Sequence, residues 1–206
     1  MRPGKIVCVG RNYAAHAAEL GNEVPKFPLI FIKPSSAVIG SGENIVYPSF
    51  SQEMHHEVEL VIKIGATIKN ASPDQAAEAI EAYTVGLDMT LRDIQAELKT
   101  KGHPWTIAKC FDTSAVIGQF KQVSEYIPNF KEKISLKING ETRQEAPLSL
   151  MLFKPVELVT YISGLMTLEK GDYIMTGTPA GVGQVNKGDV LEASVENIAT
   201  LSVSVE

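Results

Sequence analysis

The second half of the chain most limits the possible fold, because it consists of short apolar stretches separated by turn sequences. Residues 134–138 (ISLKI) run into Asn139-Gly140, a dipeptide that favours a two-residue hairpin turn. The later stretches YIMTG, VLEASV and TLSVSV alternate apolar and polar residues, with EKGD and NKGD as turns. Alternation of this kind places apolar side chains on one face of a strand. The sequence therefore predicts a sheet-rich fold.

Helix signals occur at a few separate places in the chain. Ser72, Pro73 and Gln75 form a capping box with proline at the first helical position, which predicts a helix over residues 73–82. Other helices are expected over residues 12–20 and 92–102 and from Pro155 onward, and further strands over 5–10, 29–34 and 82–90. Strands and long helices do not alternate regularly, so a doubly wound fold is disfavoured. We predict one α+β domain over residues 1–206, mainly β, with three or four short helices.

Composition narrows the class of protein. A net charge of −5, with scattered Lys and Arg residues, argues against a nucleic-acid-binding surface. No window approaches the roughly 18 apolar residues of a membrane span, and the amino terminus has no apolar stretch of signal-peptide length. Cys8 and Cys110 lie far apart in apolar contexts and are expected to be free, buried thiols. We therefore expect a cytoplasmic protein that binds neither membrane nor nucleic acid.

Acidic residues stand at unusual places in two of the predicted strands. In HHEVELVIKIG (residues 55–65), Glu57 and Glu59 are two apart and share one face of a strand, for which a solvated face is the common interpretation. Asp88 lies in the apolar stretch TVGLDMTLRD, where an unpaired carboxylate is costly. Its ordinary partners are Arg92 or the backbone at the start of the next helix. The alternative is that all three carboxylates bind one metal ion.

Three carboxylates on two strands of one sheet are suited to a hard cation. Oxygen ligands favour Mg²⁺ or Mn²⁺, with Ca²⁺ less favoured, and the lack of a dedicated Cys or His set disfavours zinc and copper. Three such ligands leave positions for water and substrate, as in a catalytic site. His55 and His56 are adjacent and point to opposite faces of a strand, so we expect at most indirect roles for them.

Six motifs in order resemble one family. They are KIVCVGRNYAAHAAEL, LIFIKPSSA, HHEVELVIKIG, GLDMTLRDIQ, GHPWTIAKCFD and IMTGTPAGVG. The chain is similar, from about Lys5 to its end, to the fumarylacetoacetate hydrolase family, in particular its short acylpyruvase and oxaloacetate decarboxylase branch. The resemblance implies a mixed β-sandwich roll and a homodimer. It also implies that Glu57, Glu59 and Asp88 are metal ligands.

The resemblance also implies roles for other residues. His16 and Glu19, three apart on a predicted helix, would otherwise be a surface pair, but the family uses the matching pair on a mobile lid to activate water. Lys109 would otherwise be a lysine extending from a strand end, but the matching lysine lies at the substrate. The positions that match the substrate pocket are Arg11, Tyr13, Arg92, Gln95 and Thr178.

The resemblance implies chemistry on small 2-oxo acids through a metal-stabilised enolate. The expected reactions are C–C bond hydrolysis of acylpyruvates and decarboxylation of oxaloacetate. The alternatives are keto–enol tautomerisation of oxaloacetate, isomerisation of the 2-hydroxyhepta-2,4-diene-1,7-dioate type, or a non-catalytic module that binds a metal or ligand. Larger hydrolases of the family have an amino-terminal domain and a further upstream acid at the metal. Neither is found in this sequence, which argues against fumarylacetoacetate as the substrate.

Overall fold

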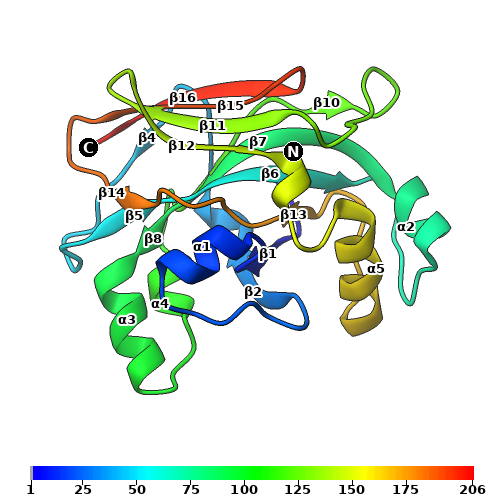
Figure 1. The fold of residues 1–206 in the computed structure, drawn as a ribbon, viewed down its shortest axis with the longest axis horizontal. Helices are drawn as coiled ribbons and strands as arrows, with labels where there is room; N and C mark the ends of the chain where they lie inside the picture. Colours follow the sequence, from blue (N-terminus) through cyan, green and yellow to red (C-terminus); the bar gives the residue numbers. More distant parts are fainter. Residues whose placement is uncertain (1) are drawn as a thin grey trace.

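The computed structural model describes residues 2–206, in which one large curved sheet supports a smaller sheet and several short helices (Figure 1). The large sheet has eight strands in the order β2-β1-β13-β6-β7-β9-β3, with β10 paired to β7. Its strands are β1 (Lys5–Gly10), β2 (Leu29–Pro34), β3 (Val38–Gly40), β6 (Val58–Ile64), β7 (Ile80–Asp88), β9 (Ala115–Ile117), β10 (Lys121–Gln122) and β13 (Tyr173–Met175). Parallel and antiparallel pairs both occur, so the sheet is mixed.

The smaller sheets cover one face and one end of the large sheet. The five-stranded sheet has the order β12-β11-β15-β16-β4 and lies along the top of Figure 1, over β6 and β7. Its strands are β4 (Asn44–Ile45), β11 (Lys133–Ile138), β12 (Glu141–Pro147), β15 (Val190–Val195) and β16 (Ala199–Val205). A third sheet joins β14 (Gly183–Gln184), β5 (Met54–His56) and β8 (Thr90–Leu91). This arrangement confirms the predicted mainly β fold with a mixed β-sandwich roll.

The hydrophobic core explains why β6 and β7 are almost continuously apolar. Leu60 and Leu87 point toward the five-stranded sheet and belong to the same buried cluster as Leu136 of β11. Val61 belongs to a second buried cluster on the opposite face, together with Met175 of β13. A sheet that is covered on both faces needs apolar side chains on both sides of each strand, and therefore at successive positions along the chain. The solvated strand face considered for Glu57 and Glu59 is therefore wrong, since both side chains are buried.

Five short α-helices occur among residues 2–206, one more than the largest number expected. They are α1 (Ala14–Glu19), α2 (Pro73–Glu78), α3 (Arg92–Thr100), α4 (Thr106–Lys109) and α5 (Pro155–Leu165). Both hydrogen bonds of the predicted capping box at Ser72 are present. Helix α2 ends four residues before the predicted limit of 82, because Ile80 already pairs with Ile64 in the large sheet. No helix in this part of the chain is long and apolar enough to cross a bilayer.

Turns and loops confirm one local expectation and correct two. Asn139 and Gly140 both have positive φ, 52° and 83°, as the predicted hairpin turn between β11 and β12 requires. Lys109 ends the unexpected helix α4 and does not extend from a strand end. Cys8 is buried, but Cys110 is only half-buried, because it lies at the edge of β2 with its thiol 3.1 Å from the Ile32 carbonyl oxygen.

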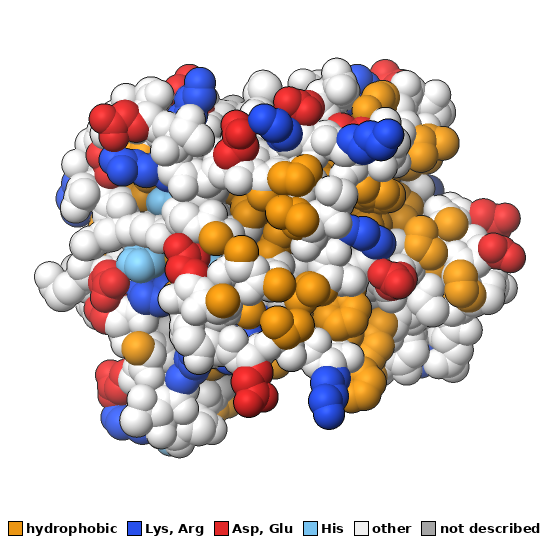
Figure 2. All heavy atoms as spheres, in the orientation of Figure 1, with side chains coloured by type: hydrophobic (Ala, Val, Ile, Leu, Met, Phe, Trp, Pro, Cys, Tyr) orange, Lys and Arg blue, Asp and Glu red, His pale blue; other side chains and the backbone are white. Residues whose placement is uncertain are grey.

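The surface seen in Figure 2 mixes acidic and basic side chains without a continuous basic stripe, while apolar side chains gather near the middle of this face. The sequence supplies both signs in similar numbers, with 19 Lys and Arg and 24 Asp and Glu residues. This face therefore lacks the continuous run of positive charge that holds a phosphate backbone.

Candidate metal centre and active site

Three buried carboxylates converge where β6 and β7 meet. Oxygen atoms of Glu57, Glu59 and Asp88 all lie within 4.8 Å of one another. Glu59 lies opposite Gly86 in the β6–β7 register, and the Asp88 backbone N–H donates to the Glu57 carbonyl oxygen at 2.9 Å. The pairing of the two strands therefore brings together acids that are 29 and 31 residues apart in the chain. The three predicted metal ligands form one cluster.

The predicted strand over residues 55–65 is interrupted at Glu57, which lies between β5 and β6. Gln144 of β12 holds this break: its Oε1 accepts from the Val58 backbone N–H at 3.1 Å and lies 2.9 Å from His56 Nδ1. Its Nε2 donates to Thr178 Oγ1 at 2.8 Å. Sequence reasoning missed Gln144, because a glutamine in a hairpin strand carries no signal of burial.

Basic side chains neutralise the cluster from several sides. Lys109 Nζ donates to Glu57 Oε2 and to Asp88 Oδ2, both at 2.8 Å. Burial opposes the charge on Lys109, but Asp88 and Glu57 outweigh it and raise the pKa of the ammonium above its usual value. Arg92 donates to Glu57 and not to Asp88, so it is not the ordinary partner that was considered for Asp88. The helix that carries Arg92 begins beside β5 and therefore presents the guanidinium to Glu57.

Lys33 of β2 is the second cation at Asp88. Its Nζ lies 2.8 Å from Asp88 Oδ1, and it also donates to the backbone carbonyl oxygens of Met89 and Lys109. The side chain is fully buried. Sequence reasoning missed Lys33, although a lysine inside the apolar strand LIFIKP was a usable signal, because a buried ammonium requires a buried acid.

The Lys33–Asp88 pair leads to a stability prediction. Lys33→Met should lower the free energy of unfolding of the metal-free protein by about 3 kcal/mol, because it leaves a buried carboxylate oxygen without its counter-charge. Added Mn²⁺ should restore part of this loss. Urea unfolding in EDTA and in Mn²⁺ measures both effects. Lys63→Met is the control: Lys63 pairs with Glu81 at 2.8 Å near the surface, so its loss should cost less than about 1 kcal/mol. Equal losses in the two variants would contradict the prediction.

Glu59 shows why the donor set suits a cation. Burial raises the pKa of Glu59 well above its usual range, and the neighbouring Asp88 and Glu57 carboxylates raise it further. One stabilising contact is the Gly177 backbone N–H, which donates to Glu59 Oε2 at 2.6 Å. Gly177 has a φ of +95°, and a Cβ atom there would lie 2.7 Å from Asn12 Cβ, so glycine permits this approach. Crowded oxygen-only ligands fit a hard divalent cation such as Mg²⁺ or Mn²⁺.

His16 of the predicted His16–Glu19 pair is buried beside this cluster, whereas Glu19 is exposed. His16 is buried, its Nδ1 lies 3.3 Å from Glu19 Oε2, and burial lowers the pKa of the imidazole. Both Glu19 oxygens accept from the Gly181 backbone N–H, at 3.0 and 3.2 Å. Gly177 and Gly181 of the loop TGTPAGVG (residues 176–183) thus donate backbone N–H groups to the carboxylates of Glu59 and Glu19. Glu19 therefore links α1 to that loop.

A small cavity of about 40 Å³ lies among these residues. Most of the predicted site residues line it: Arg11, His16, Glu57, Glu59, Asp88, Arg92, Gln95, Lys109 and Thr178. Glu19 stands behind His16, and Tyr13 lies buried in the hydrophobic core. The cavity is also lined by Lys99, which sequence reasoning missed. Its spacing of seven from Arg92 and four from Gln95 was the signal, since such spacing places all three on one helix face.

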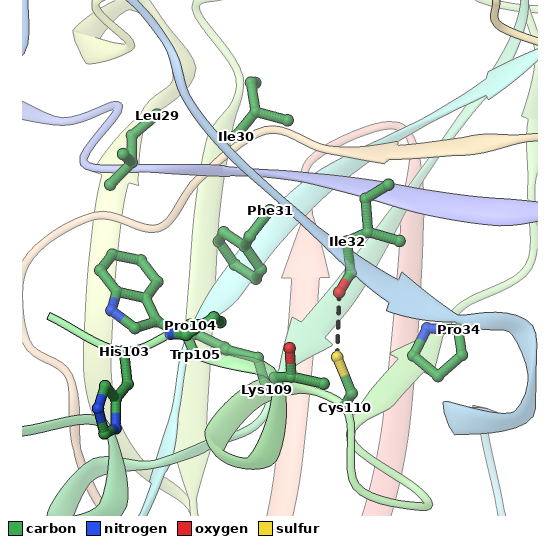
Figure 3. A pocket seen from close by; sticks show the side chains of 11 residues that line it. Leu29, Ile30, Phe31, Ile32, Pro34, His103, Pro104, Trp105, Lys109 and Cys110 are labelled. Carbon is green, nitrogen blue, oxygen red and sulfur yellow. Dashed lines mark hydrogen bonds between the residues drawn. The ribbon is translucent and has the colours of Figure 1, made fainter. Parts of the chain in front are cut away.

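A second, larger pocket of about 620 Å³ lies next to the small cavity, which we call the acid-lined cavity because Glu57, Glu59 and Asp88 line it. The two share Phe31, Trp105 and Lys109. Figure 3 shows its walls, with Phe31 and Ile32 of β2 on one side and Trp105 and Cys110 on the other. Phe31 and Trp105 meet edge to face, with ring centroids 5.9 Å apart. Lys109 Nζ lies 4.9 Å from the Phe31 ring centroid, so this aromatic pair forms one wall of the acidic site.

Comparisons with known proteins agree with this geometry. Residues 5–206 match the family model described as fumarylacetoacetate (FAA) hydrolase C-terminal. The chain is 41% identical over 201 residues to oxaloacetate tautomerase FAHD1 of Homo sapiens, covering 98% of this chain and 91% of that protein. It is 42% identical over 193 residues to oxaloacetate tautomerase YcgM of Escherichia coli, covering 93% and 88%.

A solved structure of similar sequence has the same fold. Fumarylpyruvate hydrolase from Pseudomonas aeruginosa, in complex with Mn²⁺ and pyruvate, superposes with a TM-score of 0.93 at 39% identity, covering 98% of this chain and 88% of that chain. The two folds therefore agree over nearly the whole chain. The chain belongs to the fumarylacetoacetate hydrolase family.

Proposed function

We propose that this family enzyme acts on small 2-oxo acids through their enolates, with Mg²⁺ or Mn²⁺ held by Glu57, Glu59 and Asp88. The observation that carries the proposal is the convergence of three buried carboxylates within 4.8 Å of one another. The similarity to a hydrolase solved with Mn²⁺ and pyruvate supports both the metal and the 2-oxo acid. A homodimer, a single domain over residues 1–206 and a cytoplasmic location stay predictions.

The chemistry divides between the cation and the protein. A bound divalent cation supplies Lewis-acid polarisation, which lowers the free energy of an enolate. Lys109 stays protonated between Glu57 and Asp88 and provides positive charge where negative charge develops on the substrate. Arg92 is oriented by Gln95 Oε1, to which it donates at 2.6 Å, and by His55 Nδ1 at 3.4 Å. The indirect role predicted for His55 would be to orient Arg92 in the cavity wall.

Keto–enol tautomerisation of oxaloacetate is the reaction that the cavity supports best. It requires a stabilised enolate and the exchange of a proton, but no nucleophilic water. The names of the human and Escherichia coli relatives support the same choice. Decarboxylation of oxaloacetate would instead release CO₂ and leave the enolate of pyruvate, which the same positive charges would stabilise.

Hydrolysis of acylpyruvates is the second candidate, and the His16–Glu19 pair favours it. Glu19 faces Nδ1 of His16, so Nε2 is the nitrogen that is left to accept a proton from water. The resulting hydroxide equivalent would attack the distal carbonyl carbon. The C–C bond would then break to release a carboxylic acid and pyruvate. The lowered pKa keeps this imidazole neutral and able to act as a base.

A side-by-side assay tests the proposed function. Keto–enol interconversion of oxaloacetate, its decarboxylation and cleavage of acetylpyruvate are followed with Mg²⁺, with Mn²⁺ and with EDTA. We expect metal-dependent acceleration of oxaloacetate interconversion that EDTA abolishes. Calorimetry on the same sample establishes that the metal is bound. Bound metal without turnover of either compound would contradict the proposal and favour a non-catalytic binding module.

A further inference from the structure

We propose that Lys99, together with Arg11, is a specificity-determining residue that binds the distal carboxylate of a dicarboxylic 2-oxo acid. The inference rests on the proposed function and narrows its substrate class. Lys99 lies one turn beyond Gln95 on α3, and both side chains line the acid-lined cavity. Arg11 reaches the same cavity from the end of β1.

The charges of the cavity fall into two groups. Arg92, Lys109 and Lys33 each pair with a carboxylate of the metal cluster. Three cations therefore already match the three acids. Arg11 and Lys99 differ, because neither forms an ion pair with any carboxylate among residues 2–206. Lys99 Nζ donates only to the neutral Asn22 Oδ1, at 3.3 Å. The cavity thus holds two positive charges that its own acids do not compensate.

Electrostatics supports an anion between these two side chains. Partial burial lowers the pKa of Lys99, and the neighbouring Arg11 and Arg92 lower it further, so the positive charges lie close enough to repel one another. A carboxylate placed among them would relieve this repulsion. A divalent cation at the acid cluster adds positive charge and increases the preference for a substrate with two negative charges.

The difference in burial between Asp88 and Lys99 indicates how the two ends of the substrate are oriented in the cavity. The metal cluster lies deep, with Asp88 fully buried, whereas Lys99 is exposed. A 2-oxo acid that binds by its carboxylate and oxo oxygens at the cluster therefore directs its distal end toward Lys99. Lys99 and the three acids line the same cavity, so one small substrate can contact both. A four-carbon dicarboxylate meets these conditions, while an acylpyruvate with a neutral distal group leaves Lys99 and Arg11 without an anion.

The test compares two substrates in Lys99→Met, Lys99→Arg and Lys101→Met. Lys101 is the matched control, because it follows the same helix but pairs with the exposed Glu97 and does not line the cavity. We expect Lys99→Met to lower the ratio of kcat/KM for oxaloacetate to that for acetylpyruvate roughly tenfold. Lys99→Arg should restore most of the ratio, and Lys101→Met should leave it unchanged. Equal losses for both substrates, or an unchanged ratio in Lys99→Met, would overturn the proposal.

A binding measurement separates this inference from the proposed reaction. Calorimetry in Mn²⁺ compares the Kd of difluorooxaloacetate, which cannot enolise, with that of pyruvate, which has no distal carboxylate. Lys99→Met should weaken difluorooxaloacetate roughly tenfold relative to pyruvate. This shift would support the role of Lys99 even if the enzyme turned over neither oxaloacetate nor acetylpyruvate. Equal weakening of both ligands would contradict it even in an active enzyme.

Discussion

Replacing Glu59 by glutamine should abolish most of the activity without destabilising the metal-free protein. The amide has the shape of the carboxylate and still accepts the Gly177 hydrogen bond, but it removes one of three mutually repelling charges. We therefore expect the free energy of unfolding in EDTA to stay the same or rise. Loss of a charged ligand weakens the metal and its polarising effect, so kcat/KM should fall on the order of 10³-fold.

Two measurements and one control check this result. Calorimetric titration with Mn²⁺ gives the affinity, and thermal unfolding in EDTA gives the stability of the metal-free protein. Glu81→Gln is the control, because Glu81 belongs to the neighbouring strand β7 but pairs with Lys63 away from the cluster. It should change neither metal affinity nor activity. If the Glu59→Gln variant bound Mn²⁺ as tightly as the wild-type protein, the Glu59 carboxylate would not be a metal ligand.

His16→Ala should separate hydrolysis from tautomerisation. Cleavage of acetylpyruvate should fall by roughly 10²- to 10⁴-fold, because the variant lacks the base that activates water. Interconversion of oxaloacetate should fall much less, since it needs no activated water. In the wild-type enzyme, burial lowers the pKa of His16, so hydrolysis should be lost only as the pH falls below the usual pKa range of histidine.

Two further variants examine the pair itself. Glu19→Gln keeps the size of the side chain but removes the charge beside His16 Nδ1, so it should reduce hydrolysis in the same direction as His16→Ala. Glu23→Gln changes an exposed acid just beyond α1 and should have no effect. Parallel assays of both substrates give the result. Equal losses of hydrolysis and tautomerisation in His16→Ala would indicate a shared proton-transfer step.

Local patterns in the sequence were sufficient for much of the fold. Alternation of apolar residues depends only on neighbours along the chain, and it located β11, β15 and β16. The capping box at Ser72 and the turn at Asn139-Gly140 are likewise local, because their hydrogen bonds and φ angles involve adjacent residues. Helix α4 was missed, because its four residues have too few turns to show a period.

The convergence of Glu57, Glu59 and Asp88 was predicted only when the three acids were considered together and with the family motifs. Each acid alone favoured an ordinary explanation, since neither the burial of Glu57 nor its distance from Asp88 can be derived from spacing. The break at Glu57 depends on Gln144, which is 87 residues away in the chain. A contact of that kind exists only once two sheets pack against each other.

The sequence by itself located most of the longer strands, several turns and the acids that are available for a cation. Only the tertiary structure decided how these acids are neutralised: Lys33 and Lys109 reach Asp88 from β2 and α4, while Arg92 turns to Glu57. The physical reason is that strand and turn preferences arise from adjacent residues, whereas the energy of a buried charge depends on every charge that folding brings near it.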